Sequence, residues 1–134
     1  MFKPELLVPA GSLKEIERYL AAGADAFVVG EDRFGLRLPG EMKPDEIAAA
    51  SAYAHAHGAR LYVAVNNVFA NDDLEALAEY LRRMGEIGPD AIVFGDPAVI
   101  GAMRELGVSL PLHWNAEMTS TNYAAAEYWA THGA

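Results

Sequence analysis

The stretch AGADAFVVG at residues 22–30 recurs in character as IGPDAIVFG at residues 87–95, and more loosely as HGARLYVAV at residues 57–65. Each copy reads as a helix end, a glycine that can adopt a left-handed backbone, and a short apolar strand. Repetition at a spacing of roughly 30 residues is typical of stacked strand–helix units. The residues THGA at 131–134 repeat the glycine stop without a strand after it. The pattern predicts an α/β fold in which parallel strands alternate with helices.

Five such units can be traced along the 134 residues. Apolar periodicity places the expected strands at about residues 5–9, 26–29, 61–65, 91–94 and 111–115. The expected helices lie at about residues 12–22, 44–56, 73–87 and 123–131, with one more that begins at Pro97. Glu15 follows Ser12 at the spacing of a capping box, and Pro44 and Pro97 suit the first helical position. Asn71 or Asp72 is expected to cap the third helix.

A complete (β/α) barrel has eight strands in about 250 residues. Five units of eight therefore predict a partial TIM-type (β/α) barrel, with residues 1–134 as a single domain and the N-terminal part of that barrel. An open, doubly wound sheet could also be built from five units. We prefer the barrel because PAGS at residues 9–12 has one glycine where a dinucleotide-binding turn needs three. This chain alone is expected to be inactive.

The composition excludes several classes of protein. The net charge is −9, and among the scattered basic residues only Arg82 and Arg83 are adjacent, which argues against nucleic-acid binding by this chain alone. The absence of cysteine excludes disulfides and thiolate-bound metals within the chain. No apolar run approaches the roughly 18–20 residues that span a bilayer, and no signal peptide is evident. We therefore expect a cytoplasmic protein that does not contact a membrane.

Several short motifs resemble the N-terminal region of peptidase family U32, the collagenase-like family of unknown catalytic type. They are PELLVPAGS at residues 4–12, GADA at 23–26, FGLR at 34–37, YVAVN at 62–66 and GDP at 95–97. HWNAE at residues 113–117, followed by TNY at 121–123, is similar to the branch that occurs as paired genes in Gram-positive bacteria. The resemblance covers essentially the whole chain and the first part of the family's barrel.

The resemblance implies a TIM-type barrel and two different activities. Several family members are regarded as oxygen-independent hydroxylation factors with an iron–sulfur cluster, and the paired members are similar to factors that hydroxylate the tRNA wobble uridine with prephenate. The older family label is peptidase. The cluster cysteines lie further along the family sequence, so no cofactor is expected in this chain. A cysteine-bearing paralogue is an expected partner, and tRNA is expected to bind only through other parts of the protein.

Four residues near strand ends are candidates for substrate binding. Glu31 and Arg37 belong to a long loop after the second strand, where a guanidinium could bind a carboxylate or phosphate in two-pronged fashion. Asn66 ends the third strand and could orient a substrate oxygen, and Asp96 follows the fourth strand. Each also has a structural interpretation: a surface ion pair between Arg37 and a nearby carboxylate, an Asx turn at Asn66, and a helix cap at Asp96.

Three further residues are candidates for catalysis. His113, Asn115 and Glu117 alternate along the fifth strand and share one face at a period of two. If that face points inward, the three side chains could perform acid–base chemistry. The alternative is a hydrogen-bonded layer without a catalytic role. No metal site is expected, and the serine-hydrolase and zinc-protease motifs are absent.

Open sheet edges predict self-association, because unpaired backbone groups promote pairing with another chain. We therefore expect a homo-oligomer. Three functions stay open from the sequence: part of a tRNA hydroxylation factor, a genuine hydrolase, or a non-catalytic subunit that docks the cysteine-bearing partner.

Overall fold

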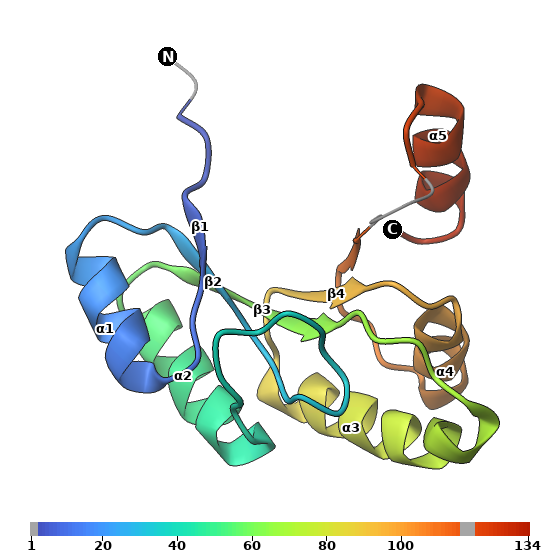
Figure 1. The fold of residues 1–134 in the computed structure, drawn as a ribbon, viewed down its shortest axis with the longest axis horizontal. Coiled ribbons are helices and arrows are strands. Elements are labelled where there is room, and N and C mark those ends of the chain that lie inside the picture. The colour runs from blue at the N-terminus through green and yellow to red at the C-terminus, as the bar shows by residue number, and fades with distance from the viewer. Residues whose placement is uncertain (1–2, 116–119) are drawn as a thin grey trace.

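The computed structural model describes residues 3–115 and 120–134 and contains one parallel sheet (Figure 1). Its strands are β1 (Leu7–Pro9), β2 (Ala26–Val29), β3 (Arg60–Val65), β4 (Ala91–Phe94) and β5 (Leu112–Trp114). The strand order is β1-β2-β3-β4-β5, and all four neighbouring pairs are parallel. A doubly wound sheet reverses its strand order at a switch point, whereas this order never reverses. The sheet therefore has the topology of a barrel, as the sequence predicts.

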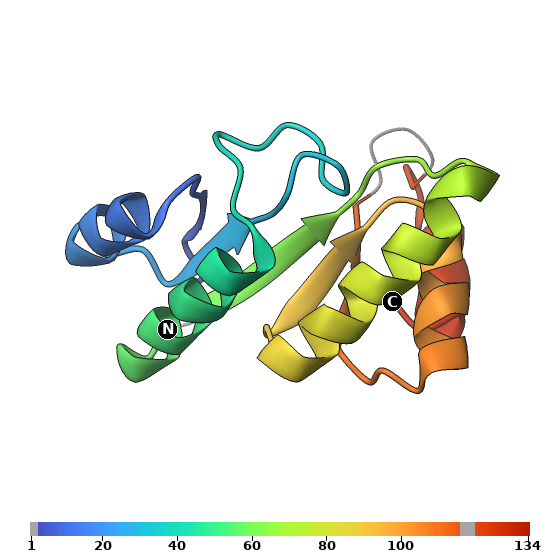
Figure 2. The same ribbon diagram turned by 90° about the horizontal axis from the view of Figure 1, so that it is seen from below.

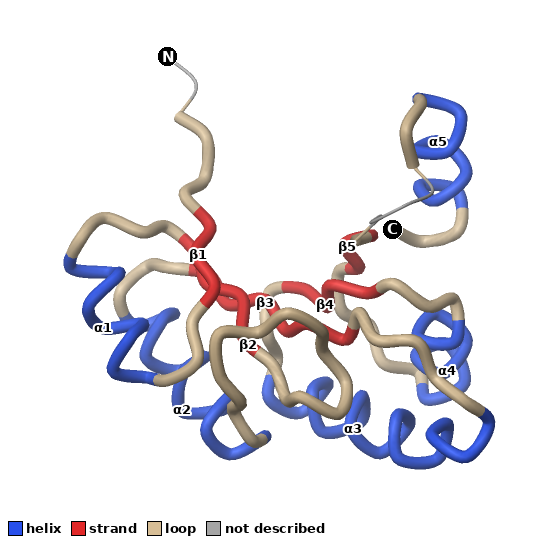
Figure 3. Tube along the Cα trace, in the orientation of Figure 1, coloured by secondary structure: helices blue, strands red, loops and turns tan. Residues whose placement is uncertain are grey.

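All but the last of the helices cover one face of this sheet. They are α1 (Leu13–Ala21), α2 (Pro44–Ala56), α3 (Leu74–Ile87), α4 (Ala98–Leu106) and α5 (Tyr123–Thr131), with a short 3-10 turn, η1 (Asn71–Asp73). Figure 1 shows α1 to α4 on one side of the sheet, while the N-terminal arm and α5 rise at its two ends. The tube in Figure 3 shows the strands along the bottom of the resulting trough. The face opposite α1 to α4 is therefore concave.

Alternation along the strands builds two apolar layers. Phe27, Leu61 and Phe94 are fully buried and belong to the core between the sheet and the helices. The residues that alternate with these along each strand point to the concave face. There Ala26, Tyr62 and Ala91 are buried, and Val28 and Val93 are partly buried against them. β3 is buried on both faces from Leu61 to Val65, as expected for a central parallel strand.

At α1 the predicted glycine stop and the Ser12 cap are confirmed, whereas Glu15 bonds the N–H of Gly11 and not that of Ser12, as a capping box would. Ser12 Oγ accepts the Glu15 N–H at 3.3 Å, and Glu15 Oε2 reaches back to accept the Gly11 N–H at 2.7 Å. Gly23, after the helix, has a φ of 101°, a left-handed conformation that favours glycine.

The prediction for the start of the third helix was wrong. Neither Asn71 nor Asp72 caps α3, because the chain first makes the turn η1. Asp73 ends that turn and its Oδ2 accepts the Ala70 N–H at 3.2 Å, so the carboxylate stabilises the turn.

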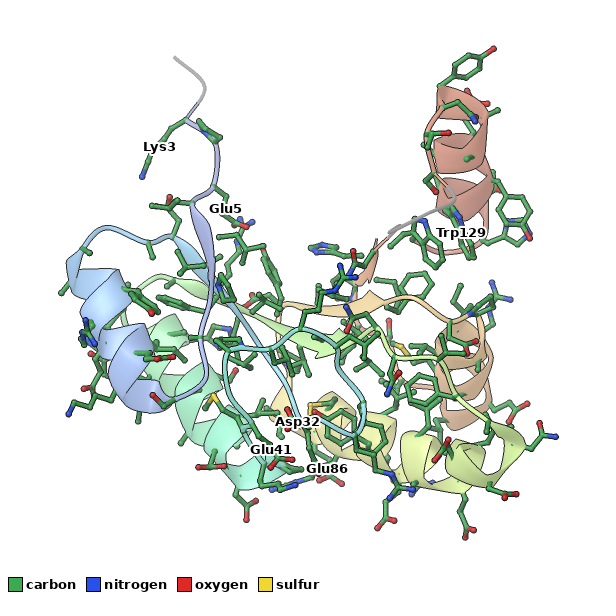
Figure 4. All side chains as sticks on the ribbon, in the orientation of Figure 1. Lys3, Glu5, Asp32, Glu41, Glu86 and Trp129 are labelled. Carbon is green, nitrogen blue, oxygen red and sulfur yellow. The ribbon has the colours of Figure 1, made fainter. Side chains whose placement is uncertain are left out.

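Aromatic packing attaches α5 to β5, the last strand of the sheet. Trp129 of α5 stacks on Trp114 of β5 with ring centroids 3.8 Å apart (Figure 4). Among the helices of residues 3–115 and 120–134, none is long and apolar enough to cross a bilayer.

Candidate functional site

A hollow of about 340 Å³ lies on the concave face, at the carboxyl ends of the strands. Its floor comes from strand side chains, and its upper wall comes from the loop of residues 30–43 and from residues that follow β3 and β5. The lining residues are Leu7, Pro9, Val28, Leu36, Arg37, Leu38, Ala64, Asn66, Val93 and Asn115. In a (β/α) barrel this end of the strands carries the active site.

The loop of residues 30–43 lies at the carboxyl ends of the strands, which are the arrowheads in Figure 2. A Cβ placed on Gly35 would lie 2.9 Å from the Ala64 carbonyl oxygen. A Cβ placed on Gly11 would lie 2.7 Å from Gly40 Cα. Glycine is required at these contacts because backbone meets backbone, and the loop therefore forms a fixed wall of the hollow.

Asn66 lines the hollow and has a defined orientation. Its Oδ1 accepts the Leu36 N–H at 2.8 Å, across 30 positions of sequence. A backbone N–H only donates, so the amide oxygen must face Leu36 and the amide NH₂ forms the other end of the side chain. The side chain of Asn66 therefore binds the backbone of the loop at Leu36, and not its own backbone as the Asx-turn interpretation expects.

Arg37 also lines the hollow, and it is the one non-glycine residue with positive φ, at 57°, in the described part of the chain. A left-handed backbone is costly for a residue with a Cβ. Such strain is typical of functional sites, where the surrounding structure holds the residue in place.

Glu31 lies outside the lining of the hollow. Its carboxylate is 14% exposed, and its Oε1 accepts from Lys43 Nζ at 2.7 Å. The same ammonium donates to Glu41 Oε1 at 2.7 Å. Hydrogen bonds to Glu31 and then Glu41 raise the pKa of Lys43. Glu31 thus helps to fix the base of the loop.

Beneath the loop, Phe34 stacks on Tyr80 of α3, with ring centroids 4.0 Å apart and an interplanar angle of 18°. Both rings are 5% exposed. Burial, and then the charge of Glu31, raises the pKa of the Tyr80 phenol. Tyr80 is therefore a neutral packing surface for the loop.

Asp96 is not brought to the hollow either. Its Oδ1 accepts the Ala98 N–H at 2.9 Å at the start of α4, and its Oδ2 accepts the Phe69 N–H at 3.1 Å. Asp96 thus binds the first turn of α4 from one residue before the N-cap, which is Pro97 and not Asp96 as predicted. Its two bonds also tie the β3–α3 connection to the β4–α4 connection.

Of the three candidates predicted on the fifth strand, the structure describes His113 and Asn115, and it brings only Asn115 to the hollow. Asn115 lines the hollow, and its backbone N–H donates to the Phe94 carbonyl at 2.8 Å. His113 is exposed and packs edge-on against Tyr62, with ring centroids 5.0 Å apart, outside the lining of the hollow. Glu117 lies outside the described residues.

Tyr62 belongs to a second polar group on the concave side. Its Oη donates to Glu5 Oε1 at 2.7 Å, and Arg60 NH1 donates to Glu5 Oε2 at 3.1 Å. Glu5 lies on the N-terminal arm (Figure 4), so this group fastens the arm across β2 to β3. The sequence alone gave no signal for this contact.

The chemistry of the hollow follows from its lining. Arg37 brings a guanidinium, Asn66 and Asn115 bring amides, and the other seven described lining residues are apolar. A guanidinium beside amide groups over an apolar floor suits an anion with an apolar body. The apolar contribution of the loop, from Leu36 and Leu38, was missed in the sequence, where the leucines flanking Arg37 were the available signal.

Among the residues that the structure describes, the lining of the hollow has no His, Cys, Asp or Glu side chain. Residues 3–115 and 120–134 hold no group of three His, Cys, Asp or Glu side chains that could bind a metal ion. An iron–sulfur cluster needs cysteine thiolates, and this chain has no cysteine. The residues present therefore do not fit that cofactor.

Sequential parallel strands, helices on the convex face and a hollow at the carboxyl ends of the strands define a (β/α)-barrel-type domain. The chain belongs to peptidase family U32, whose family model matches residues 11–134. A solved structure of a U32 peptidase superimposes on all of this chain and 59% of its own, with a TM-score of 0.76 and 15% identity. D-psicose 3-epimerase from Clostridium cellulolyticum shares the fold more distantly, with a TM-score of 0.59 and 14% identity over 96% of this chain and 56% of its own.

Curated relatives of this chain are named for tRNA hydroxylation, whereas the family is named for peptidase activity. The chain is 51% identical to tRNA hydroxylation protein P2 of Bacillus subtilis over 100% of its own length and 43% of the relative's. It is 37% identical to tRNA hydroxylation protein P of Escherichia coli over 99% of its length and 30% of the relative's. The chain thus spans less than half of these relatives. Their names favour the hydroxylation interpretation over the peptidase one.

Proposed function

We propose that this chain is the N-terminal part of the barrel of a cytoplasmic tRNA hydroxylation protein, and that its hollow binds a small carboxylate co-substrate such as prephenate. The observation that carries the proposal is the convergence of Arg37, Asn66 and Asn115 over an apolar floor at the carboxyl ends of the strands. The names of the relatives support the hydroxylation activity.

The lining matches the two halves of such a ligand. A guanidinium can bind a carboxylate through two parallel hydrogen bonds, and an amide NH₂ can donate a further bond. Val28, Ala64 and Val93 offer apolar surface to a carbon ring. No step of the hydroxylation itself is assigned to these residues, whose part is to bind and orient the co-substrate.

The remaining requirements of the reaction are proposed to lie outside this chain. The scattered basic residues and the net charge of −9 do not form a surface for a polyphosphate. Other parts of the protein would therefore bind tRNA. A cysteine-bearing paralogue or segment would hold an iron–sulfur cluster.

The binding test compares two arginines of the same loop. In Arg37→Ala we expect the Kd for prephenate, measured by titration calorimetry, to rise roughly tenfold or more, since a charge-assisted hydrogen bond is lost. Arg33→Ala is the matched control, because Arg33 does not line the hollow and its guanidinium lies 3.6 Å from Asp73. Equal Kd values for the wild type and Arg37→Ala would refute this role for the hollow. In cells, the Arg37 variant should also lower wobble-uridine hydroxylation of tRNA.

A further inference from the structure

We propose that Asn67 is a positioning residue, which does not line the hollow but fixes residues 31–38 so that Arg37 lies over it. The inference rests on the proposed function for the identity of the ligand. The placement of the loop can be measured independently of any ligand.

Asn67 uses its backbone and both ends of its side chain for this purpose. Its N–H donates to the Phe34 carbonyl at 3.0 Å, and its Nδ2 donates to the Arg33 carbonyl at 3.1 Å. Its Oδ1 accepts the Val68 N–H at 2.8 Å. Since Val68 can only donate there, the amide oxygen is fixed and the NH₂ must point to the loop. Asn67 thus binds two successive carbonyls of a segment more than 30 positions away in the sequence.

A second anchor lies immediately before Arg37. The Leu36 N–H is bound by Asn66 Oδ1 at 2.8 Å, and the Phe34 ring is held on Tyr80. Residues 33, 34 and 36 are therefore all attached, and Arg37 with its φ of 57° comes next. A strained conformation persists when the surrounding structure overdetermines it, and these attachments supply that constraint.

The position of Asn67 separates its role from binding. Asn67 is absent from the lining of the hollow, whereas its neighbour Asn66 is part of it. Loss of the Asn67 side chain would leave every lining side chain in the sequence but release the carbonyl of Arg33. The ligand would then have to order the loop on binding, and that conformational cost lowers affinity.

The first measurement is hydrogen exchange on the full chain. In Asn67→Ala we expect faster exchange of the Leu36 amide and of the segment 31–38, with the strands unchanged. Asn67→Asp is the second variant: it keeps an oxygen for the Val68 N–H but has no donor for Arg33, so it should loosen the same segment. Circular dichroism confirms that each variant is folded. Unchanged exchange at Leu36 in both folded variants would overturn the proposal.

The second measurement is a double-mutant cycle with prephenate as the probe. We expect Asn67→Ala to raise the Kd about fivefold when Arg37 is present and to have no effect in an Arg37→Ala background, since coupled residues are not additive. An equal rise in both backgrounds would show that Asn67 does not act through Arg37, and would refute the positioning role.

The two readouts distinguish the failure of each idea. If the wild type does not bind prephenate but Leu36 exchange quickens in the variants, the proposed ligand is wrong and the placement of the loop by Asn67 stands. If prephenate binds and neither readout responds to Asn67, the proposed function stands and the positioning role is wrong.

Discussion

Arg37 combines, at the scale of one residue, a left-handed backbone with a charged side chain on the wall of the hollow. Its left-handed backbone costs a residue with a Cβ roughly 1 kcal/mol, and glycine would avoid that cost. The charged side chain nevertheless occupies this position, on the wall of the hollow.

This strain gives a prediction that separates stability from binding. Arg37→Gly should be more stable than Arg37→Ala by about 1 kcal/mol, because only glycine adopts positive φ without a steric penalty. Both variants should bind prephenate equally weakly. Urea unfolding measures the stability and calorimetry measures the affinity. Equal unfolding free energies for the two variants would show that the backbone of Arg37 is not strained.

At the scale of elements, Asp90 connects the end of α2 and the starts of β3 and β4. It precedes β4, and its Oδ2 accepts the Leu61 N–H of β3 at 2.8 Å and lies 2.8 Å from His55 Nε2 of α2. Burial raises the pKa of this carboxyl, but the bonds from Leu61 and His55 outweigh it and lower the pKa overall. A carboxyl with a lowered pKa stabilises the fold above its unfolded pKa, and that stabilisation is lost as the pH falls through the folded pKa.

Asp90→Asn should therefore have a pH-dependent effect on the free energy of unfolding. At neutral pH we expect a loss of about 1 kcal/mol, because a partly exposed charged acceptor is replaced by a neutral one. The difference from the wild type should shrink as the pH falls below about 4, the ordinary pKa of an aspartate, and on through the lowered pKa of the folded Asp90 carboxyl. Denaturant titrations between neutral and acidic pH measure it, with the exposed Asp72→Asn as a control. A difference that does not change with pH would contradict the ionic role of Asp90.

The elements themselves were largely predictable from the sequence because their signals are local. Pro44 and the glycine stops at Gly23 and Gly88 mark helix ends within a few residues of the structure. The placement of the loop was not predictable, since Asn66, Asn67 and Lys43 act on partners that proximity in sequence does not reveal. The sequence places Arg37, Asn66 and Asn115 after strands, and the carboxyl ends of parallel strands meet at one end of the sheet, so their proximity was predictable. Glu31 and Asp96 also follow strands, and only their long-range partners in the structure show that they lie outside the hollow.

At the scale of the whole molecule, the concave face and the two outer strands of the described sheet define the surface through which the domain would meet another chain. β1 and β5 each pair with one neighbour only. Leu6 and Leu7 at the β1 edge are 52% and 44% exposed. Exposed strand edges with apolar side chains promote association.

We therefore predict that the purified chain self-associates. Sedimentation equilibrium should show a dimer or larger species at micromolar concentration. Leu7→Lys should shift the equilibrium toward monomer, because a charge on the edge disfavours strand pairing. Val68→Lys is the control, since Val68 is 79% exposed and lies outside the sheet. A folded wild-type monomer over the whole concentration range would refute this prediction.

The contact between Gly11 and Gly40 has a consequence for how the sequence of this domain can diverge. Each glycine faces the backbone of the other, so a side chain at either position would push the β2–α2 loop away from the segment that leads into α1. Gly101 in α4 has open space around it and can accept alanine freely. A substitution at Gly101 therefore needs no second change elsewhere in the chain. Gly11 and Gly40, in contrast, constrain each other although they are far apart in the sequence. A homologue that replaces either glycine is expected to differ in the conformation of the loop as well.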